Sequence, residues 1–119
     1  MYEIKVKGSF SAAHNLKNYR GKCEHLHGHN WTVEAVFSYS SLDKDGLAID
    51  FRIAKRALKR VIEKLDHSYL NDSKFFKKIN PTSENIAKFI YDAMKKTIKD
   101  LKSISVWENE NSCAIYMED

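Results

Sequence analysis

The sequence predicts a small α+β protein in which two helices cover one face of an antiparallel four-stranded sheet. Three observations support this prediction. Apolar and polar residues alternate in two stretches near the N-terminus, and two short strand-like stretches joined by a turn lie near the C-terminus. Between these regions, two stretches repeat their apolar residues at helical spacing. The resulting order β-β-α-α-β-β is typical of helices packed on one face of a sheet made of hairpins.

The first two strands are predicted from the alternation of apolar and polar residues. The first begins at Tyr2 and has its apolar residues on one parity, which His14 shares. The second covers about residues 29–39, where His29 shares the parity of the apolar residues. Because side chains two apart in a strand point to the same face, each strand has one face for the core. The polar residues 15–28 between them predict a loop, so both histidines are expected near strand ends in one sheet.

The two helices are predicted from their caps and their apolar stripes. Asp50 is a typical N-cap for the first helix. Pro81 predicts the start of the second, with Thr82 or Ser83 as its cap. The apolar positions at helical spacing are Phe51, Ala54, Leu58, Val61, Ile62 and Leu65 in the first helix, and Ile86, Phe89, Ile90, Ala93, Met94 and Ile98 in the second. Two short strands, at about 104–108 and 113–117, close the chain.

Length and composition predict one domain over residues 1–119, with a modest core. No apolar run approaches the roughly 20 residues that span a bilayer. The start of the chain lacks a signal-peptide core, so we expect a cytoplasmic protein that does not bind membranes. The net charge is +4, but no long run of Lys or Arg occurs, which argues against nucleic acid as a partner. A reducing compartment also argues against a disulfide between Cys23 and Cys113.

His27-Gly28-His29, together with His14, predicts a metal site. Two histidines at i and i+2 of an extended segment face the same side, roughly 6–7 Å apart at Cα. Gly28 keeps the approach between them free of a side chain. A lone histidine is more often an ordinary surface residue, but a third imidazole on a neighbouring strand reverses that balance. Three histidines leave the fourth position of zinc open, as in catalytic sites, so zinc is the expected ion. His25 lies on the opposite parity and is not expected to be a ligand.

Further polar residues could carry acid/base or binding chemistry. Cys23 lies in the polar loop beside the expected metal, where a nearby cation favours the thiolate. Asp66-His67 follows the first predicted helix and could form a proton relay; an interaction of the histidine with the helix dipole is equally compatible. Glu108 and Glu110 share one parity of a late strand, where a carboxylate could accept paired hydrogen bonds from a guanidine-like heterocycle. The alternative is a solvated hairpin tip.

Several motifs occur in the same order as in one known family and cover nearly the whole chain. They are Phe10-Ser11-Ala12-Ala13-His14, Cys23-x-x-x-His27-Gly28-His29, Gly46-Leu47-Ala48-Ile49-Asp50-Phe51, Leu65-Asp66-His67-Ser68-Tyr69-Leu70-Asn71 and Asn80-Pro81-Thr82-Ser83-Glu84-Asn85-Ile86-Ala87. Together they resemble the 6-pyruvoyl-tetrahydropterin synthase / 6-carboxy-tetrahydropterin synthase family. The resemblance implies the tunnelling fold, in which the sheets of three subunits join into a barrel. Two such trimers often stack into a hexamer, with the active site between subunits.

The resemblance also implies roles for individual residues, by position. Zinc would be bound by His14, His27 and His29; the proton relay would consist of Cys23, Asp66 and His67; and the pterin would be held by Glu108, Thr82 and Ser83. The sequence departs from the family at two places. Asn109 follows Glu108 where relatives often have Thr or Ser, so Glu110 stays a rival anchor. Glu24 directly follows Cys23, and some relatives that resemble side-chain-cleaving enzymes use Glu as the acid/base in place of Cys.

By this resemblance, the chain would be a zinc-dependent lyase acting on 7,8-dihydroneopterin triphosphate. The three-residue gap between Cys23 and His27 resembles the branch that makes 6-carboxy-5,6,7,8-tetrahydropterin for 7-deazaguanine (queuosine-type) tRNA modification. Two enzymatic alternatives stay open: 6-pyruvoyl-tetrahydropterin synthase, and side-chain cleavage to 6-hydroxymethyl-dihydropterin. A pterin-binding oligomeric protein without catalysis is a third alternative, but such a protein would not need an intact relay.

Overall fold

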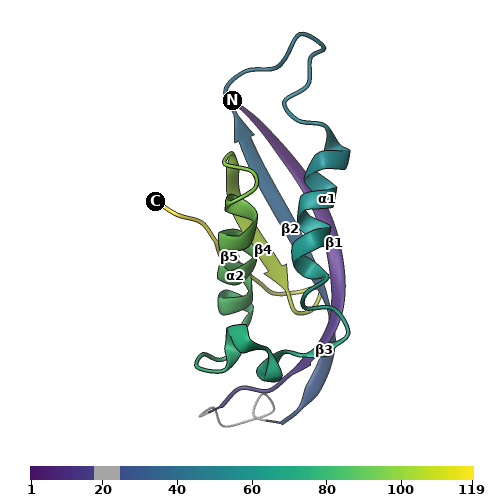
Figure 1. The fold of residues 1–119 in the computed structure, drawn as a ribbon, viewed down its shortest axis with the longest axis vertical. Helices are drawn as coiled ribbons and strands as arrows, with labels where there is room; N and C mark the ends of the chain where they lie inside the picture. The colour runs from purple at the N-terminus through teal and green to yellow at the C-terminus, as the bar shows by residue number, and fades with distance from the viewer. Residues whose placement is uncertain (18–24) are drawn as a thin grey trace.

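The structure is a computed structural model, and it describes residues 1–17 and 25–119. The predicted strands and helices follow one another in the predicted order, with one additional short strand between the two helices (Figure 1). The elements are β1 (Tyr2–His14), β2 (His27–Tyr39), α1 (Phe51–Ile62), β3 (Ser68–Tyr69), α2 (Ser83–Lys95), β4 (Leu101–Trp107) and β5 (Cys113–Tyr116), with two 3-10 turns, η2 (Leu70–Asp72) and η3 (Lys74–Phe76). The predicted α+β class is confirmed.

All five of these strands belong to one sheet, in the spatial order β3-β1-β2-β4-β5. β1 and β2 pair antiparallel over their whole length, which places His14 opposite His27. β4 pairs antiparallel with β2, and β5 pairs antiparallel with β4. The predicted four-stranded antiparallel sheet therefore gains a fifth strand, because β3 pairs in parallel with Ala12 and Ala13 of β1. A strand of two residues is too short to show an alternation in the sequence.

Both helices lie on the same face of the sheet, as predicted (Figure 1). α1 packs on β1, and α2 packs on β4 and β5. The covered face has the apolar parity of each strand, so that Trp31 and Ala35 of β2 are fully buried. The opposite face has the polar parity, where Lys5 and Lys7 of β1 lie 3.4 and 3.6 Å from the carboxylate oxygens of Glu34. The alternation in the sequence thus decides which face forms the core.

Each helix begins at a predicted cap. The Asp50 side chain accepts a hydrogen bond from the backbone N of Arg52. The Thr82 hydroxyl accepts one from the backbone N of Asn85, so Thr82 rather than Ser83 is the cap of α2. Such caps each stabilise a helix by about 1 kcal/mol.

One residue of the predicted apolar helix stripes is exposed in the structure. Phe51 opens α1, and its side chain is 57% exposed rather than buried. The buried residues of α1 begin one turn later, at Ala54. Neither α1 nor α2 has the length and apolar composition of a membrane-crossing helix, and no other helix in the described part of the chain has them.

Candidate metal centre

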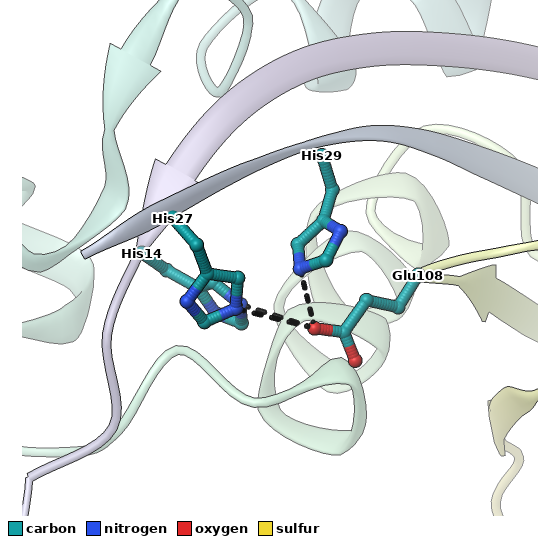
Figure 2. A group of neighbouring side chains, drawn as sticks. All are labelled: His14, His27, His29 and Glu108. Carbon is teal, nitrogen blue, oxygen red and sulfur yellow. Dashed lines mark hydrogen bonds and ion pairs between the residues drawn. The ribbon is translucent and has the colours of Figure 1, made fainter. Parts of the chain in front are cut away.

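Four side chains converge at one end of the β1–β2 hairpin (Figure 2). His14 ends β1, His27 and His29 begin β2, and Glu108 directly follows β4. Since β2 lies between β1 and β4, the sheet register brings the three segments side by side. The candidate ligand atoms of the four residues all lie within 4.8 Å of one another. We call this set the His₃Glu group.

The distances within the His₃Glu group suit a single metal ion. The Nε2 atoms of His14 and His27 are 3.0 Å apart. Glu108 Oε1 lies 2.8 Å from His29 Nε2, 3.2 Å from His14 Nε2 and 3.7 Å from His27 Nε2. Ligand atoms about 2.0–2.1 Å from a tetrahedral zinc ion would be about 3.3–3.4 Å apart, which falls inside this observed range. The four residues could therefore hold a metal ion.

His29 provides a second sign that the group fits a metal. Its Nε2 atom is buried and has no assigned hydrogen-bond partner among the described residues, although Glu108 Oε1 lies 2.8 Å away. A buried polar atom without a partner is costly, and a metal ion would satisfy it. Burial is the largest influence on the pKa of His29 and lowers it. The Glu108 carboxylate raises that pKa, whereas His27 and His14 lower it further. The net shift is downward, which favours the neutral imidazole that metals bind.

Hydrogen bonds behind two of the rings orient them toward the centre. His14 Nδ1 donates to the carbonyl oxygen of Pro81, 2.7 Å away, and His27 Nδ1 donates to that of His25, also 2.7 Å away. Because a carbonyl oxygen only accepts, the proton of each ring is assigned to Nδ1. Each Nε2 then has a free lone pair directed into the group. Partners of this kind are usual behind metal-binding histidines.

An aromatic ring closes the inner side of the group. The buried Trp31 packs edge-on against His14 and His29, with ring centroids 4.9 and 5.2 Å apart. Its indole N donates to the carbonyl of Ala12, which fixes the ring. His14 itself is only 2% exposed. The inner side of the His₃Glu group is therefore apolar and rigid, while Glu108 lies on the more open side.

Two asparagines that the sequence analysis did not single out hold the chain directly after β1. Asn71 accepts from the backbone N of Asn15 and donates to its carbonyl, at 3.0 and 2.9 Å. Asn80 makes the same pair of bonds with Lys17, at 2.9 and 3.0 Å. Asn80 also directly precedes Pro81, whose carbonyl orients His14. These side chains replace a pairing strand where β1 has ended, a role that residue spacing does not reveal.

Asp66 and His67 lie together at the edge of β1, apart from the His₃Glu group. Asp66 Oδ1 accepts from the backbone N of Ser11, and the backbone N of His67 donates to the Ser11 carbonyl. His67 has a φ of 54°, and its side chain is 83% exposed, with Nε2 3.5 Å from Asp66 Oδ2. It lies beyond the last turn of α1, where the effect of the helix dipole has faded. Within one chain, His67 thus faces solvent and the half-buried Asp66 is bonded to β1, and neither belongs to the His₃Glu group.

The remaining predicted residues separate into different surroundings. Ser83 lines a cavity of about 180 Å³ that Glu108 also lines. Glu110 instead lines a wider cavity of about 460 Å³ with Trp107 and Thr32, on the face of the sheet that the helices leave uncovered. The structure therefore places Glu108, and not Glu110, with the histidines. Cys23 and Glu24 lie outside the described residues.

Known proteins of one family match this chain along nearly its whole length. Residues 3–119 match the family model described as 6-pyruvoyl tetrahydropterin synthase. The 6-carboxy-5,6,7,8-tetrahydropterin synthase of Synechocystis sp. is 35% identical, over 98% of this chain and 93% of its own. The dihydroneopterin monophosphate aldolase of Pyrococcus furiosus is 37% identical, over 88% of both chains. The structure of Caenorhabditis elegans 6-pyruvoyl tetrahydropterin synthase superposes with a TM-score of 0.89 at 26% identity, covering 99% of this chain and 96% of that one. The predicted tunnelling fold is confirmed.

Proposed function

Because the chain belongs to the 6-pyruvoyl tetrahydropterin synthase family, we propose that it is a zinc-dependent lyase that converts 7,8-dihydroneopterin triphosphate to 6-carboxy-5,6,7,8-tetrahydropterin. The observation that carries this proposal is the His₃Glu group, whose donor atoms and spacing suit zinc. The choice of product is supported by 35% identity to the Synechocystis sp. 6-carboxy-5,6,7,8-tetrahydropterin synthase.

In this proposal the three imidazoles hold zinc through their Nε2 atoms. His14 and His27 are held in the required tautomer by the carbonyls behind them, and burial keeps His29 neutral. Zinc bound there would act as a Lewis acid toward the hydroxyls of the substrate side chain, which makes the neighbouring C–H protons more acidic.

Glu108 is the proposed anchor of the pterin. An ionised carboxylate can accept two parallel hydrogen bonds from the amino-pyrimidine edge, which fixes the heterocycle in its plane. Glu108 lines one cavity with Ser83 and also contacts the three imidazoles, which supports this role for both residues. Thr82 contributes by capping α2 and so fixing the wall of that cavity.

Cys23 is the proposed general base, with Asp66 and His67 completing the relay. The side chain of His67 faces solvent in one chain, and neither it nor Asp66 belongs to the His₃Glu group among the described residues. The sequence resemblance implies an active site between subunits, so in this proposal a second copy supplies the Asp66-His67 pair of the relay.

We expect the protein to assemble into a hexamer, as a dimer of trimers whose sheets join into barrels. Only Ala12 and Ala13 of β1 pair with β3, so most of the outer edge of β1 has no neighbouring strand in the described chain. Such edges are usually paired or covered. Light scattering should report about six times the chain mass of 13.8 kDa. A stable and active monomer at micromolar concentration would contradict this prediction.

A second candidate is cleavage of the side chain to 6-hydroxymethyl-dihydropterin. The observation that favours it is the 37% identity to the Pyrococcus furiosus dihydroneopterin monophosphate aldolase. Glu24 provides a carboxylate beside Cys23 for the acid/base step. The 6-pyruvoyl-tetrahydropterin product of other relatives would need the same zinc and relay, so only the product distinguishes the three reactions.

One connected core of buried side chains supports the prediction that residues 1–119 form one domain. A cytoplasmic location and a place in a queuosine-type pathway stay predictions.

Turnover of 7,8-dihydroneopterin triphosphate by the purified, zinc-loaded protein tests the proposed function. We expect the substrate to disappear with release of triphosphate. A chelator should abolish the reaction and added zinc should restore it, because the imidazoles alone supply no Lewis acid. A zinc-loaded hexamer that binds the substrate but leaves it intact would refute the lyase and favour a pterin-binding protein.

A further inference from the structure

Glu108 contacts the three histidines through a single oxygen atom. Oε1 lies 2.8, 3.2 and 3.7 Å from the Nε2 atoms of His29, His14 and His27. Figure 2 shows that the other carboxylate oxygen points away from the rings. This is the arrangement of a carboxylate that binds an ion through one atom. In the described part of the chain, the outer oxygen has no hydrogen-bond or ion-pair partner.

The four members of the His₃Glu group differ in how firmly they are held. The side chain of His14 is 2% exposed and bonded from behind by the Pro81 carbonyl. The His27 ring donates a hydrogen bond from Nδ1 to the backbone carbonyl of His25, just before β2. Glu108 is 29% exposed, follows the last residue of β4 and lines the adjoining cavity of about 180 Å³. Glu108 can therefore leave the His₃Glu group more easily than His14 and His27.

We propose that Glu108 is the fourth metal ligand when no substrate is bound, and that it is the ligand that leaves. One carboxylate lowers the charge of a divalent site with three neutral imidazoles from +2 to +1, which strengthens metal binding. A site with four protein ligands is closed, and a lyase needs an open position. The pterin would open it by drawing the carboxylate into the cavity; this last step alone rests on the proposed function.

Cobalt titration tests the ligand directly, because the visible absorption of Co²⁺ reports the number and type of its ligands. Purified wild type, Glu108→Ala, Glu108→Gln and Glu110→Ala are each titrated with Co²⁺ in the absence of any pterin. We expect Glu108→Ala to weaken Co²⁺ binding by at least about tenfold, the low end of what losing even an outer partner of a ligand costs. Its absorption bands should also shift. Glu110→Ala is the matched control, because Glu110 has the same side chain but lines the other cavity. It should bind Co²⁺ like wild type.

Azide binding shows whether the fourth coordination position of the bound Co²⁺ is open. The Co²⁺ spectrum of wild type should resist added azide, whereas that of Glu108→Ala should change as azide binds. Glu108→Gln keeps the side-chain volume and replaces the alanine variant if that variant fails to fold. Its affinity for Co²⁺ should be at least about threefold lower than that of wild type. Smaller losses in the variants, or azide binding to wild type as tight as to Glu108→Ala, would overturn the inference. A protein that passes these tests but makes no pterin product would refute the proposed function alone.

Discussion

Replacing His27 with alanine should abolish stoichiometric zinc binding and reduce turnover to near the background rate. His27 supplies one of three imidazole ligands, so its loss should cost more than the about 10–100-fold that removal of an outer partner costs. The fold should survive, because the side chain of His27 is 27% exposed and lies outside the buried core. Metal content by mass spectrometry or atomic absorption, with circular dichroism for the fold, measures both effects.

The chain provides a matched control for this variant in His25. It is the same residue type two positions earlier, and its backbone carbonyl, which orients His27, is kept in His25→Ala. His25→Ala should therefore retain one zinc per chain. Full zinc occupancy in His27→Ala would show that the His₃Glu group is not the metal site.

Replacing Cys23 with alanine should reduce formation of the carboxy-pterin product by about 10²–10⁴-fold, the usual cost of removing a general base. Zinc content should stay at the wild-type level, since the three imidazoles are intact. Glu24→Ala is the matched comparison because the two residues are adjacent, and it should be mild if Cys23 is the base. Turnover and product identity of wild type and both variants, at one pH, measure the difference.

A large effect of Glu24→Ala, instead of Cys23→Ala, would identify a different reaction. If 6-hydroxymethyl-dihydropterin forms with wild type and disappears in Glu24→Ala, the side-chain-cleaving reaction is correct and Glu24 is its acid/base. Near-normal turnover by Cys23→Ala, with any product, would show that Cys23 is not the base.

Local patterns in the sequence predicted most of the fold. Alternation identified the long strands and placed His14 and His29 on the core-facing parity, which the register of β1 and β2 confirms. Caps and apolar spacing identified both helices. The two-residue β3 was missed because it pairs with β1 at a distance of more than fifty residues and has no pattern of its own.

The candidate site was only partly predictable, because its parts meet through the sheet. The three histidines were grouped from their spacing and parity. Glu108 was considered as a pterin anchor or as part of a solvated hairpin tip, but not as a metal ligand, since its place beside His14 depends on the pairing of β4 with β2. The amide bonds of Asn71 and Asn80 to the backbone were missed for the same reason. Spacing along one chain also gives no information on how Asp66 and His67 of a second copy would approach.

Mass spectrometry of the products that the purified, zinc-loaded protein forms tests the proposed lyase reaction most directly. It should be supplied in parallel with 7,8-dihydroneopterin triphosphate and with the monophosphate. We predict that the triphosphate yields 6-carboxy-5,6,7,8-tetrahydropterin, with loss of triphosphate and of a two-carbon fragment from the three-carbon side chain. We predict no comparable turnover of the monophosphate. Accumulation of 6-pyruvoyl-tetrahydropterin or of 6-hydroxymethyl-dihydropterin, or recovery of both substrates unchanged, would contradict this account.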